Sequence, residues 1–503
     1  MRRNLSQVIW GGDKPGRAIT LGIQHVFAMF GSTVLVPALT GLDASVTLLS
    51  MGIGTLIFHL VTRGIVPAFM GSSFSFITAI CAVMTKCGGN AAYVGWGIMA
   101  SGLLYLILAA LVKVFGVKKI TGFFPPVVTG CMIIIIGMML APTAMSNITG
   151  VPGTYGFYDP IEIVESAEQK DGFVRFENGT VKGWISMDDL EQTEDGSWRV
   201  ANENGTQLLD EATADAKPLT ATLRWKYWVV GIFTILVIVL VMFFVRGFFK
   251  LIPILIGIVA GYLLSIALGL VDFSALEAAP WFTLPKTSFF LQKDLDWSGV
   301  GYAVTMIAPI AVVTFVEHVG DITANGAVTG HNYLEDPGLH RTLLGCGLAS
   351  VFSGGLGGPA ATTYSENTGV LAATRNYNPA TLRIAALFAI ALAFVGKVSG
   401  LLKSIPAPVM GGVSVILFGM IASVGLRMLV ESKVDFTRSY NLIIAGVMLV
   451  FGLGLSSGIT VGSVTISGTA IAAVLGILLS RILPKKDADE RQEEKLAAQN
   501  RRQ

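Results

Sequence analysis

The chain has 503 residues, of which 53% are hydrophobic and only 14% are charged, and its mean hydropathy is +0.67. A soluble protein carries about 25% charged residues, so the composition excludes an ordinary globular domain and predicts an all-α polytopic membrane protein. The formal net charge of +2 hides an asymmetry, because residues 150–222 hold 15 acidic and only 5 basic residues.

Long apolar blocks recur along the chain and predict transmembrane helices. About 20 such residues cross the ~30 Å hydrocarbon core of a bilayer. Basic residues gather in short connections, at Lys118-Lys119, between Arg246 and Lys250, and at Lys485-Lys486, and the positive-inside rule places these connections in the cytoplasm. The N-terminal residues 1–17 and the tail 484–503 are therefore predicted to be cytoplasmic. The clearest blocks are 18–38, 93–114, 226–246, 252–271 and 440–455.

The acidic segment 150–222 follows the fifth predicted span and so falls outside the cell. It contains alternating patches such as "GFVRFENGTVKGWISM", which are separated by glycine-bearing turns. Short alternating runs between turns are typical of β-hairpins. We expect a small extracellular β-rich insert.

Two stretches are too broken for simple spans, although apolar segments flank them. "GSSFSFITAI" covers 71–80 and "GGLGGPAATTYSENTG" covers 354–369, and both are rich in Gly, Ser and Thr. Irregular backbone within a membrane is tolerated only where it is buried in protein or lines a cavity. These stretches therefore indicate a site.

Internal similarity relates the two halves of the chain. "PVVTGCMIIIIGM" at 126–138 aligns without gaps to "PVMGGVSVILFGM" at 408–420, and "QHV" at 24–26 aligns to "EHV" at 317–319. The latter offset of 293 residues also lays 71–74 on 364–367. The helix at 18–38 then pairs with one of opposite direction near 299–320. An inverted repeat with broken elements is typical of secondary transporters whose site lies at the membrane midplane.

Three acidic residues of the second half, Glu317, Asp321 and Glu366, lie in apolar or small-residue surroundings. An ionised carboxylate at a bilayer centre costs about 2.5–3.5 kcal/mol on insertion scales, so its presence there indicates function. Glu317 and Asp321 are four residues apart and share one helix face. Carboxyl groups that gain and lose a proton as substrate binds are what proton-coupled transport requires.

Each carboxylate also has a structural alternative at this stage. Asp321 could be hydrated at the cytoplasmic end of its helix, and Glu317 could pair with His318 or a distant arginine. Glu366 could cap a half-helix that begins near Asn367, a position that suits an anion and can still face a ligand. For His318, which points away from the other two, we favour a structural role. The chain shows no complete nucleotide-binding or catalytic motif, so we expect no enzyme activity, cofactor or metal.

Four segments carry a resemblance to a known family. "QHVFAMFGSTVLVPALTG", "EHVGDITANG", "TTYSENTGVLAATR" and "PAPVMGGVSVILFGMI" closely resemble the nucleobase–cation symporter (nucleobase–ascorbate transporter) family, and its bacterial uracil permeases in particular. The run Glu366-Asn367-x-Gly369-x4-Thr374-Arg375 fits the family signature. The resemblance covers 15–483 except for the insert 150–222.

The resemblance implies a fold of fourteen transmembrane segments, arranged as two inverted repeats of seven, with short antiparallel strands in segments 3 and 10. Members are commonly homodimers. A core domain would comprise 18–120 (segments 1–4) and 296–400 (segments 8–11). A gate domain would comprise 121–271 (segments 5–7, with the insert) and 401–483 (segments 12–14).

The resemblance also implies roles for particular residues. Glu317 matches the glutamate that hydrogen-bonds the pyrimidine ring, and Glu366 matches its partner from segment 10. Asp321 departs from uracil permeases, which carry a histidine there, whereas purine transporters carry an acid. Phe418 replaces a tyrosine on the gate side. The remaining positions that line the pocket are Ser32, Phe74, Tyr364 and Ser365.

We therefore expect a proton-coupled uracil importer of the cytoplasmic membrane that works by alternating access. Its partners would be uracil, protons, the lipid bilayer and a second copy of the chain, with no nucleic acid. Three alternatives remain open. They are a proton-coupled purine (xanthine or uric acid) symporter, a nucleobase sensor that binds without transport, and, ranked last, an anion exchanger of related architecture.

Overall fold

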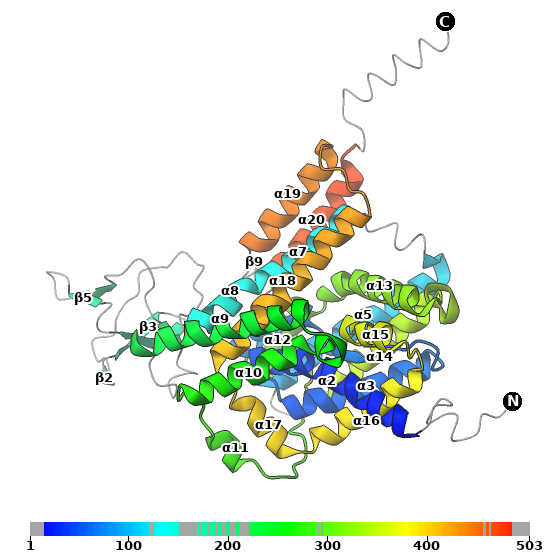
Figure 1. Cartoon of the computed structure of the whole chain (residues 1–503). Helices are drawn as coiled ribbons and strands as arrows, with labels where there is room; N and C mark the ends of the chain where they lie inside the picture. The colour runs from blue at the N-terminus through cyan, green and yellow to red at the C-terminus, as the bar shows by residue number, and fades with distance from the viewer. Residues whose placement is uncertain are drawn as a thin grey trace, which may run out of the picture.

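The computed structural model describes residues 15–484 with internal gaps, and its helices form one bundle (Figure 1). The gaps fall at 118, 120–124, 150–168, 171–172, 179–180, 187–189, 193–197, 201–207, 211–220, 290–291, 293–294, 456–458 and 462–463. The tail 485–503 and residues 1–14, including most of the predicted cytoplasmic N-terminus, lie outside the described residues.

The first half of the chain forms helices close to the predicted spans. Within the described residues these elements are α2 (Pro15–Thr40), α3 (Ala44–Val61), β1 (Met70–Ser72), η1 (Phe74–Phe76), α4 (Ile77–Lys86), α5 (Ala91–Phe115), α7 (Pro126–Met139), α8 (Ala141–Thr149), α9 (Ala221–Phe244), η4 (Gly247–Leu251), α10 (Pro253–Ala267) and α11 (Ser274–Ala278). The apolar blocks 18–38, 93–114, 226–246 and 252–271 correspond to α2, α5, α9 and α10.

The second half repeats the alternation of long helices with short broken elements. Its elements are α12 (Trp297–Ile307), α13 (Ile310–Thr329), η5 (Leu334–Gly338), α14 (Leu339–Gly355), β8 (Ala361–Thr363), α15 (Ser365–Thr374), α16 (Pro379–Ala393), α17 (Gly396–Lys403), α18 (Ala407–Glu431), α19 (Ser439–Gly454), β9 (Ile459–Val461), β10 (Val464–Ile466) and α20 (Gly468–Ile482). The block 440–455 corresponds to α19.

Many of these helices suit a membrane. Within the described residues, seven helical spans are long and apolar enough to cross a bilayer, and five shorter apolar helices accompany them. Exposed Leu, Ile, Val and Phe side chains cover the outer faces of α5, α9 and α19. The chain is thus a multi-pass membrane protein, as its composition predicts.

The helix expected near 299–320 is interrupted in the structure. α12 ends at Ile307 and α13 begins at Ile310, with Pro309 as its N-cap. Proline lacks the backbone N–H that would continue the helix ladder, so a break at this point has a local cause, although the two helices still form one apolar span, Trp297–Thr329.

Two three-residue strands from opposite halves pair at the centre of the bundle. β1 and β8 are antiparallel, with Met70 opposite Thr363 and Ser72 opposite Ala361. This pairing confirms the antiparallel strands that the resemblance implies. β8 begins 291 residues after β1, so the predicted offset of 293 is wrong by two residues here. Elements compared between the two halves differ slightly in length, as in the 18 residues of α3 and the 17 of α14.

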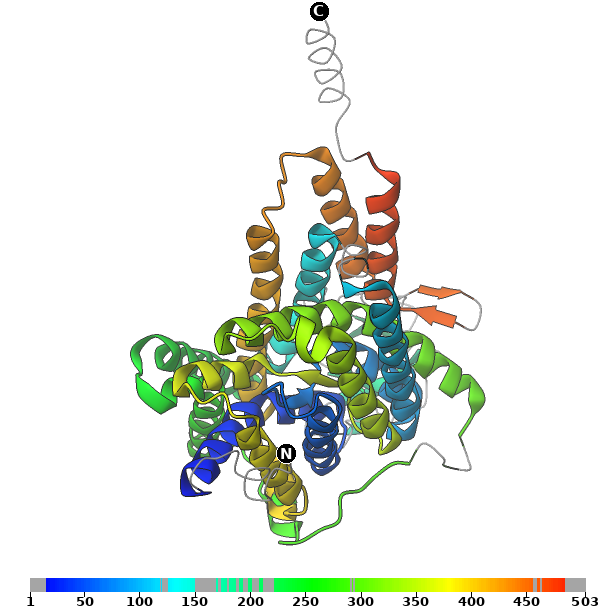
Figure 2. The same ribbon diagram turned by 90° about the vertical axis from the view of Figure 1, so that its right-hand side faces the viewer.

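Helix packing in one half is mirrored in the other. α3 packs on α16 while α14 packs on α5, and the hairpin of α9 and α10 has a counterpart in α19 and α20. α7 crosses α18, and these two helices rise together with α19 and α20 (Figures 1 and 2). At the crossing, a Cβ added to Gly425 would lie 2.6 Å from the carbonyl oxygen of Gly130, so glycine permits the close approach.

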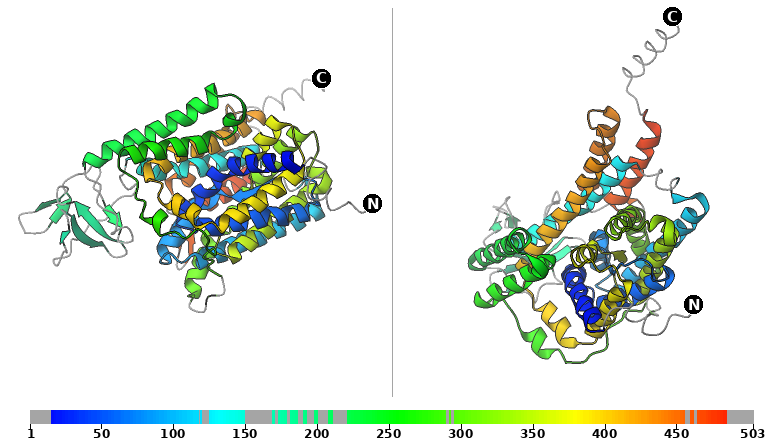
Figure 3. Two further views of the ribbon diagram at one scale, coloured as in Figure 1. Left: turned by 60° about the horizontal axis from the view of Figure 1, so that its bottom comes forward. Right: turned by 45° about the vertical axis from the view of Figure 1, so that its right-hand side comes forward.

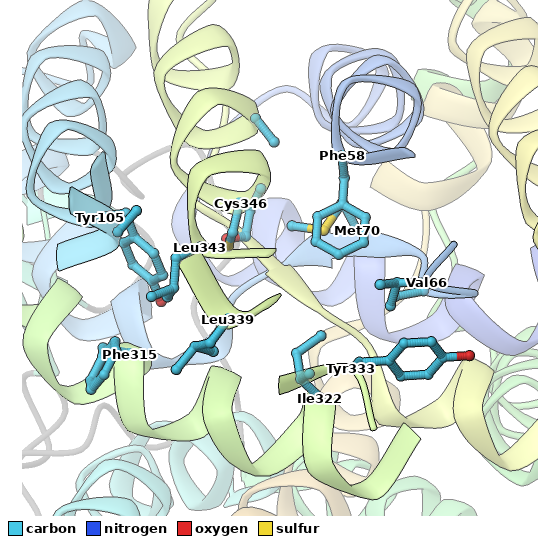
Figure 4. Packing of buried hydrophobic residues seen from close by; sticks show 14 of the residues in the cluster. Phe58, Val66, Met70, Tyr105, Phe315, Ile322, Tyr333, Leu339, Leu343 and Cys346 are labelled. Atoms are coloured by element: carbon cyan, nitrogen blue, oxygen red, sulfur yellow. The ribbon is translucent and has the colours of Figure 1, made fainter. Parts of the chain in front are cut away.

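A buried cluster supports the strand pair from one side. Met70 of β1 packs with Phe58 of α3, Phe315 of α13 and Leu343 of α14, each at most 1% exposed (Figure 4). Because four elements meet at this cluster, it fixes the position of β1 relative to the helix that carries Glu317.

The acidic insert forms strands. β2 (Gln169–Lys170), β3 (Phe173–Asn178), β4 (Val181–Ser186) and β7 (Leu208–Asp210) form an antiparallel sheet in the order β2-β3-β4-β7. β5 (Leu190–Gln192) pairs with β6 (Trp198–Val200). These strands lie beyond the helix bundle, near α9 (Figure 3).

Candidate functional site

The two carboxylates of α13 each accept a hydrogen bond from a broken element. The Ser75 hydroxyl of η1 donates to Glu317 Oε2 at 3.1 Å, and the Thr363 hydroxyl of β8 donates to Asp321 Oδ2 at 2.9 Å. The i, i+4 spacing predicted this shared helix face. Asp321 is half-buried and bonded to β8, which differs from the hydrated helix end considered above.

Glu366 brings a third carboxylate to the same place. It lies in the first turn of α15, directly after β8, and α15 packs against α13, the helix that carries Glu317 and Asp321. The first turn of a helix carries partial positive charge, which stabilises an anion there. The structure therefore brings together the three acids that the sequence singled out.

Two aromatic rings border this acidic group. Phe74 begins η1 and Tyr364 is the N-cap of α15, and their rings lie nearly parallel, with ring centroids 6.5 Å apart and an interplanar angle of 10°. The Tyr364 hydroxyl donates to the backbone carbonyl of Ser72 at 2.9 Å and lies 3.1 Å from the Ser72 Oγ. Tyr364 is 4% exposed, so its ring is a fixed wall.

The remaining predicted pocket residues are less fully placed. Ser32 lies on α2 and Ser365 begins α15, and the side chains of both fall outside the described residues. Phe418 is buried in α18 within the apolar cluster that also holds Leu35 and Leu140, and Phe74 packs against that cluster.

Two buried histidines support the site from behind. His318 bonds the Thr342 hydroxyl through Nε2 at 3.0 Å and meets the Tyr105 ring edge-on, which agrees with the structural role favoured from the sequence. The Asn367 amide donates to His25 Nδ1 at 3.0 Å and ties α15 to α2. This pair was not predicted, although both residues belong to segments that carry the resemblance.

Sequence reasoning also missed the residues that fix the carboxylates and the ring. Ser75 and Thr363 belong to the broken stretches, but their hydroxyls carry no pattern that distinguishes them from neighbouring Ser and Thr. Gly71 lies in β1, where a Cβ would overlap Cζ and Cε2 of Tyr364. A glycine inside a short strand is the one available signal, because it indicates close approach of another group.

Comparison with known proteins identifies the family. A family model described as a permease family matches residues 16–163 and 210–461. The chain belongs to this permease family. The unmatched residues 164–209 contain strands β2 to β6, so this part of the insert lies outside the family model.

The curated relatives of this permease confirm the predicted resemblance. It is 40% identical over 476 residues to the uracil permease of Bacillus caldolyticus, with 94% of each chain covered. It is 34% identical to the uracil permease of Escherichia coli K12, covering 93% of this chain and 91% of that protein.

Solved structures share the fold of this permease at low identity. The transmembrane domain of the cyanobacterial bicarbonate transporter BicA has a TM-score of 0.56 at 13% identity, with 92% of this chain and 96% of that chain covered. SLC26A9 has a TM-score of 0.59 at 11% identity, covering 92% of this chain and 64% of that one. These likenesses show a membrane-transporter fold.

Proposed function

We propose that this permease imports uracil together with protons across the cytoplasmic membrane by alternating access. The observation that carries the proposal is the approach of three carboxylates beside the β1–β8 pair: Glu317 and Asp321 lie inside the apolar span Trp297–Thr329, and Glu366 lies on α15, which packs against α13. Three carboxylates at such a place are costly unless they bind a partner, and the curated relatives are uracil permeases.

The chemistry of the group suits a pyrimidine ring. Uracil offers N–H donors, which the carboxylates of Glu317 and Glu366 accept, and carbonyl acceptors, which backbone N–H groups at the start of α4 and α15 satisfy. Phe74 and Tyr364 supply apolar contact for the ring faces. A site that pairs every polar edge rejects analogues that lack one.

Proton coupling in this proposal uses the same carboxyl groups. Glu317 and Glu366 lie close enough for their charges to interact, so one proton shared in the group lowers the repulsion. A protonated carboxyl of this pair donates to a uracil carbonyl while the remaining carboxylate accepts from a uracil N–H, so a bound proton and a bound base favour each other. Asp321 extends this proton-binding group along α13.

The proposed transport movement is a rocking of two domains. The core comprises 18–120 and 296–400, and the gate comprises 121–271 and 401–483. The mirrored packing of α3 on α16 and α14 on α5 supports fourteen segments in two inverted repeats. In this arrangement both termini are cytoplasmic, the insert is extracellular and two copies associate as a homodimer.

A second candidate is a purine symporter on the same frame, with xanthine or uric acid as substrate. The observation in its favour is Asp321, whose carboxylate is held by Thr363 beside the other two acids. A larger base with further N–H donors would use this third acceptor.

The test is uptake of radiolabelled uracil into proteoliposomes, with and without an inward proton gradient. Glu366→Gln is compared with Glu431→Gln, the same change at an exposed position near the end of α18. Gradient-driven uptake that is lost only in Glu366→Gln and is insensitive to excess xanthine supports the proposal. Uptake displaced by xanthine favours the purine symporter, and binding without counterflow favours a sensor.

A further inference from the structure

A small cavity lies beside the carboxylate group, between elements of the proposed core and gate. It has a volume of about 40 Å³ and is bounded by residues of η1 and α4, the end of α7, the α12–α13 junction and the start of α20. Four hydroxyl-bearing residues line it, two from the η1–α4 segment and two from the start of α20. The first two are Ser75 and Thr78, and the others are Ser467 and Thr469.

The size of the cavity suits water and excludes a nucleobase. One water requires roughly 10–15 Å³ by this measure, so the cavity has room for about three. The hydroxyls supply the polar partners that buried water needs. A pyrimidine ring is several times larger than a water molecule and does not fit.

The cavity is connected to Glu317 through one hydrogen bond. Ser75 lines the cavity and its hydroxyl donates to Glu317 Oε2 at 3.1 Å. A hydroxyl that donates one hydrogen bond can still accept others, so Ser75 can accept from a cavity water. At the other side the hydroxyls of Ser467 and Thr469 lie 3.0 Å apart at the N-terminus of α20, and the β9–β10 hairpin directly precedes them (Figure 2).

We propose that this cavity holds the waters that deliver the proton to Glu317, by a route separate from the path of the nucleobase. A hydronium ion gives up a proton at the α20 end, and each water or hydroxyl in the chain accepts one proton and passes one on. Ser75 gives its proton to Glu317 and is reprotonated from the cavity. The carboxylate ends protonated and the hydronium ion ends as water. This inference rests on the proposed proton-coupled function.

The decisive variant is Thr78→Val, which removes a cavity hydroxyl and nearly keeps the side-chain shape. Thr78→Ser restores the hydroxyl. Thr305→Val is the matched control, because Thr305 lies on α12 and its hydroxyl donates to the Tyr302 carbonyl at 2.9 Å. The readouts are gradient-driven uracil uptake with proton flux from a pH dye, uracil counterflow at equal pH, and uracil binding.

The expected result is a split between these readouts. Thr78→Val lowers gradient-driven uptake and proton flux by about tenfold or more, which corresponds to ~1.4 kcal/mol in the barrier for proton delivery, while binding and counterflow stay at the wild-type level. Thr78→Ser and Thr305→Val behave as wild type. Ala82→Leu, which fills the cavity, reproduces the loss.

Two results would overturn the inference. One is unchanged gradient-driven uptake in both Thr78→Val and Ala82→Leu. The other is an equal loss of gradient-driven uptake and of counterflow in Thr78→Val, which would show that the Thr78 hydroxyl has a structural role. If Thr78→Val does not fold, Thr469→Val on the opposite wall is measured in the same way and decides. If the wild-type protein neither binds nor exchanges uracil, the proposed function itself is refuted, and this outcome differs from a failure of the proton route alone.

Discussion

Gly71→Ala gives the sharpest test of how the pocket wall is built. The added Cβ overlaps the Tyr364 ring, and real Cβ atoms essentially never approach another heavy atom within 3.0 Å. The ring must therefore move. Tyr364 is held by its hydroxyl on the Ser72 carbonyl at 2.9 Å and by its backbone N–H on the Phe69 carbonyl at 3.1 Å, so moving the ring breaks the first of these bonds.

The cost follows from two terms. Overpacking a well-packed site costs about 1–3 kcal/mol. Loss of one buried hydrogen bond adds about 1 kcal/mol. The sum of about 2–4 kcal/mol is the cost of holding the ring in its present position. Where uracil binding requires that position, it corresponds to a roughly 30- to 1000-fold loss of uracil affinity, since ~1.4 kcal/mol is tenfold.

Uracil binding to purified protein, together with the midpoint of thermal unfolding, measures this cost. Gly446→Ala is the control, because a Cβ on that α19 glycine meets nothing within 4 Å. In the double variant with Tyr364→Ala the ring is absent, so the Gly71 change adds little further loss of stability and the two costs are non-additive. Wild-type affinity in Gly71→Ala, or strictly additive costs in the double variant, refutes the reasoning.

Two further predictions concern carboxylates. Thr363→Val removes the hydrogen-bond donor to Asp321, a charge-assisted bond of about 1.5–3 kcal/mol, and so lowers uracil uptake at low uracil concentration by about ten- to a hundredfold. Thr363→Ser keeps the donor and retains uptake. Equal uptake in the two variants contradicts this prediction. Asp296, before α12, has a pKa below its usual 3.8 because the hydroxyl and then the backbone N–H of Ser298 donate to it. A lowered folded-state pKa stabilises the fold above pH 3.8, and this contribution is lost as the pH falls through the lowered value. Asp296→Asn should therefore flatten the acid side of the curve of melting temperature against pH, and an unchanged curve would show that the bond is not maintained.

Much of the fold was predictable because membrane helices are specified by hydrophobic blocks. α2, α5 and α9 fall where apolar blocks are long enough to cross a bilayer, and α10 and α19 fall on shorter apolar blocks. The convergence of Glu317 and Asp321 follows from their i, i+4 spacing, and that of Glu366 from the paired strands. These features depend on local periodicity and on the cost of burying charge, both of which the sequence displays.

What the sequence did not predict depends on contacts between distant segments. The two-residue error at β1 and β8 arose because short alignments do not record differences in element length. The break before α13 has a proline as its only local sign. The partners Ser75 and Thr363 were missed because any of several neighbouring hydroxyls satisfies the same pattern, and only the packing of η1 and β8 on α13 selects these two.

The attachment of the insert has a consequence for engineering and for evolution. It departs from the end of α8 and returns into α9, and these helices touch, with a Cβ on Gly231 meeting Ile148 at 2.9 Å. An excursion that leaves and returns on two contacting helices can change length at little entropic cost, about 0.6 kcal/mol per doubling. The strands between Thr149 and Ala221 therefore form an exchangeable cassette. A reporter domain or an epitope spliced there would leave the helices around Glu317 unstrained, and lineages of permeases can acquire or discard such a module without rebuilding the membrane frame.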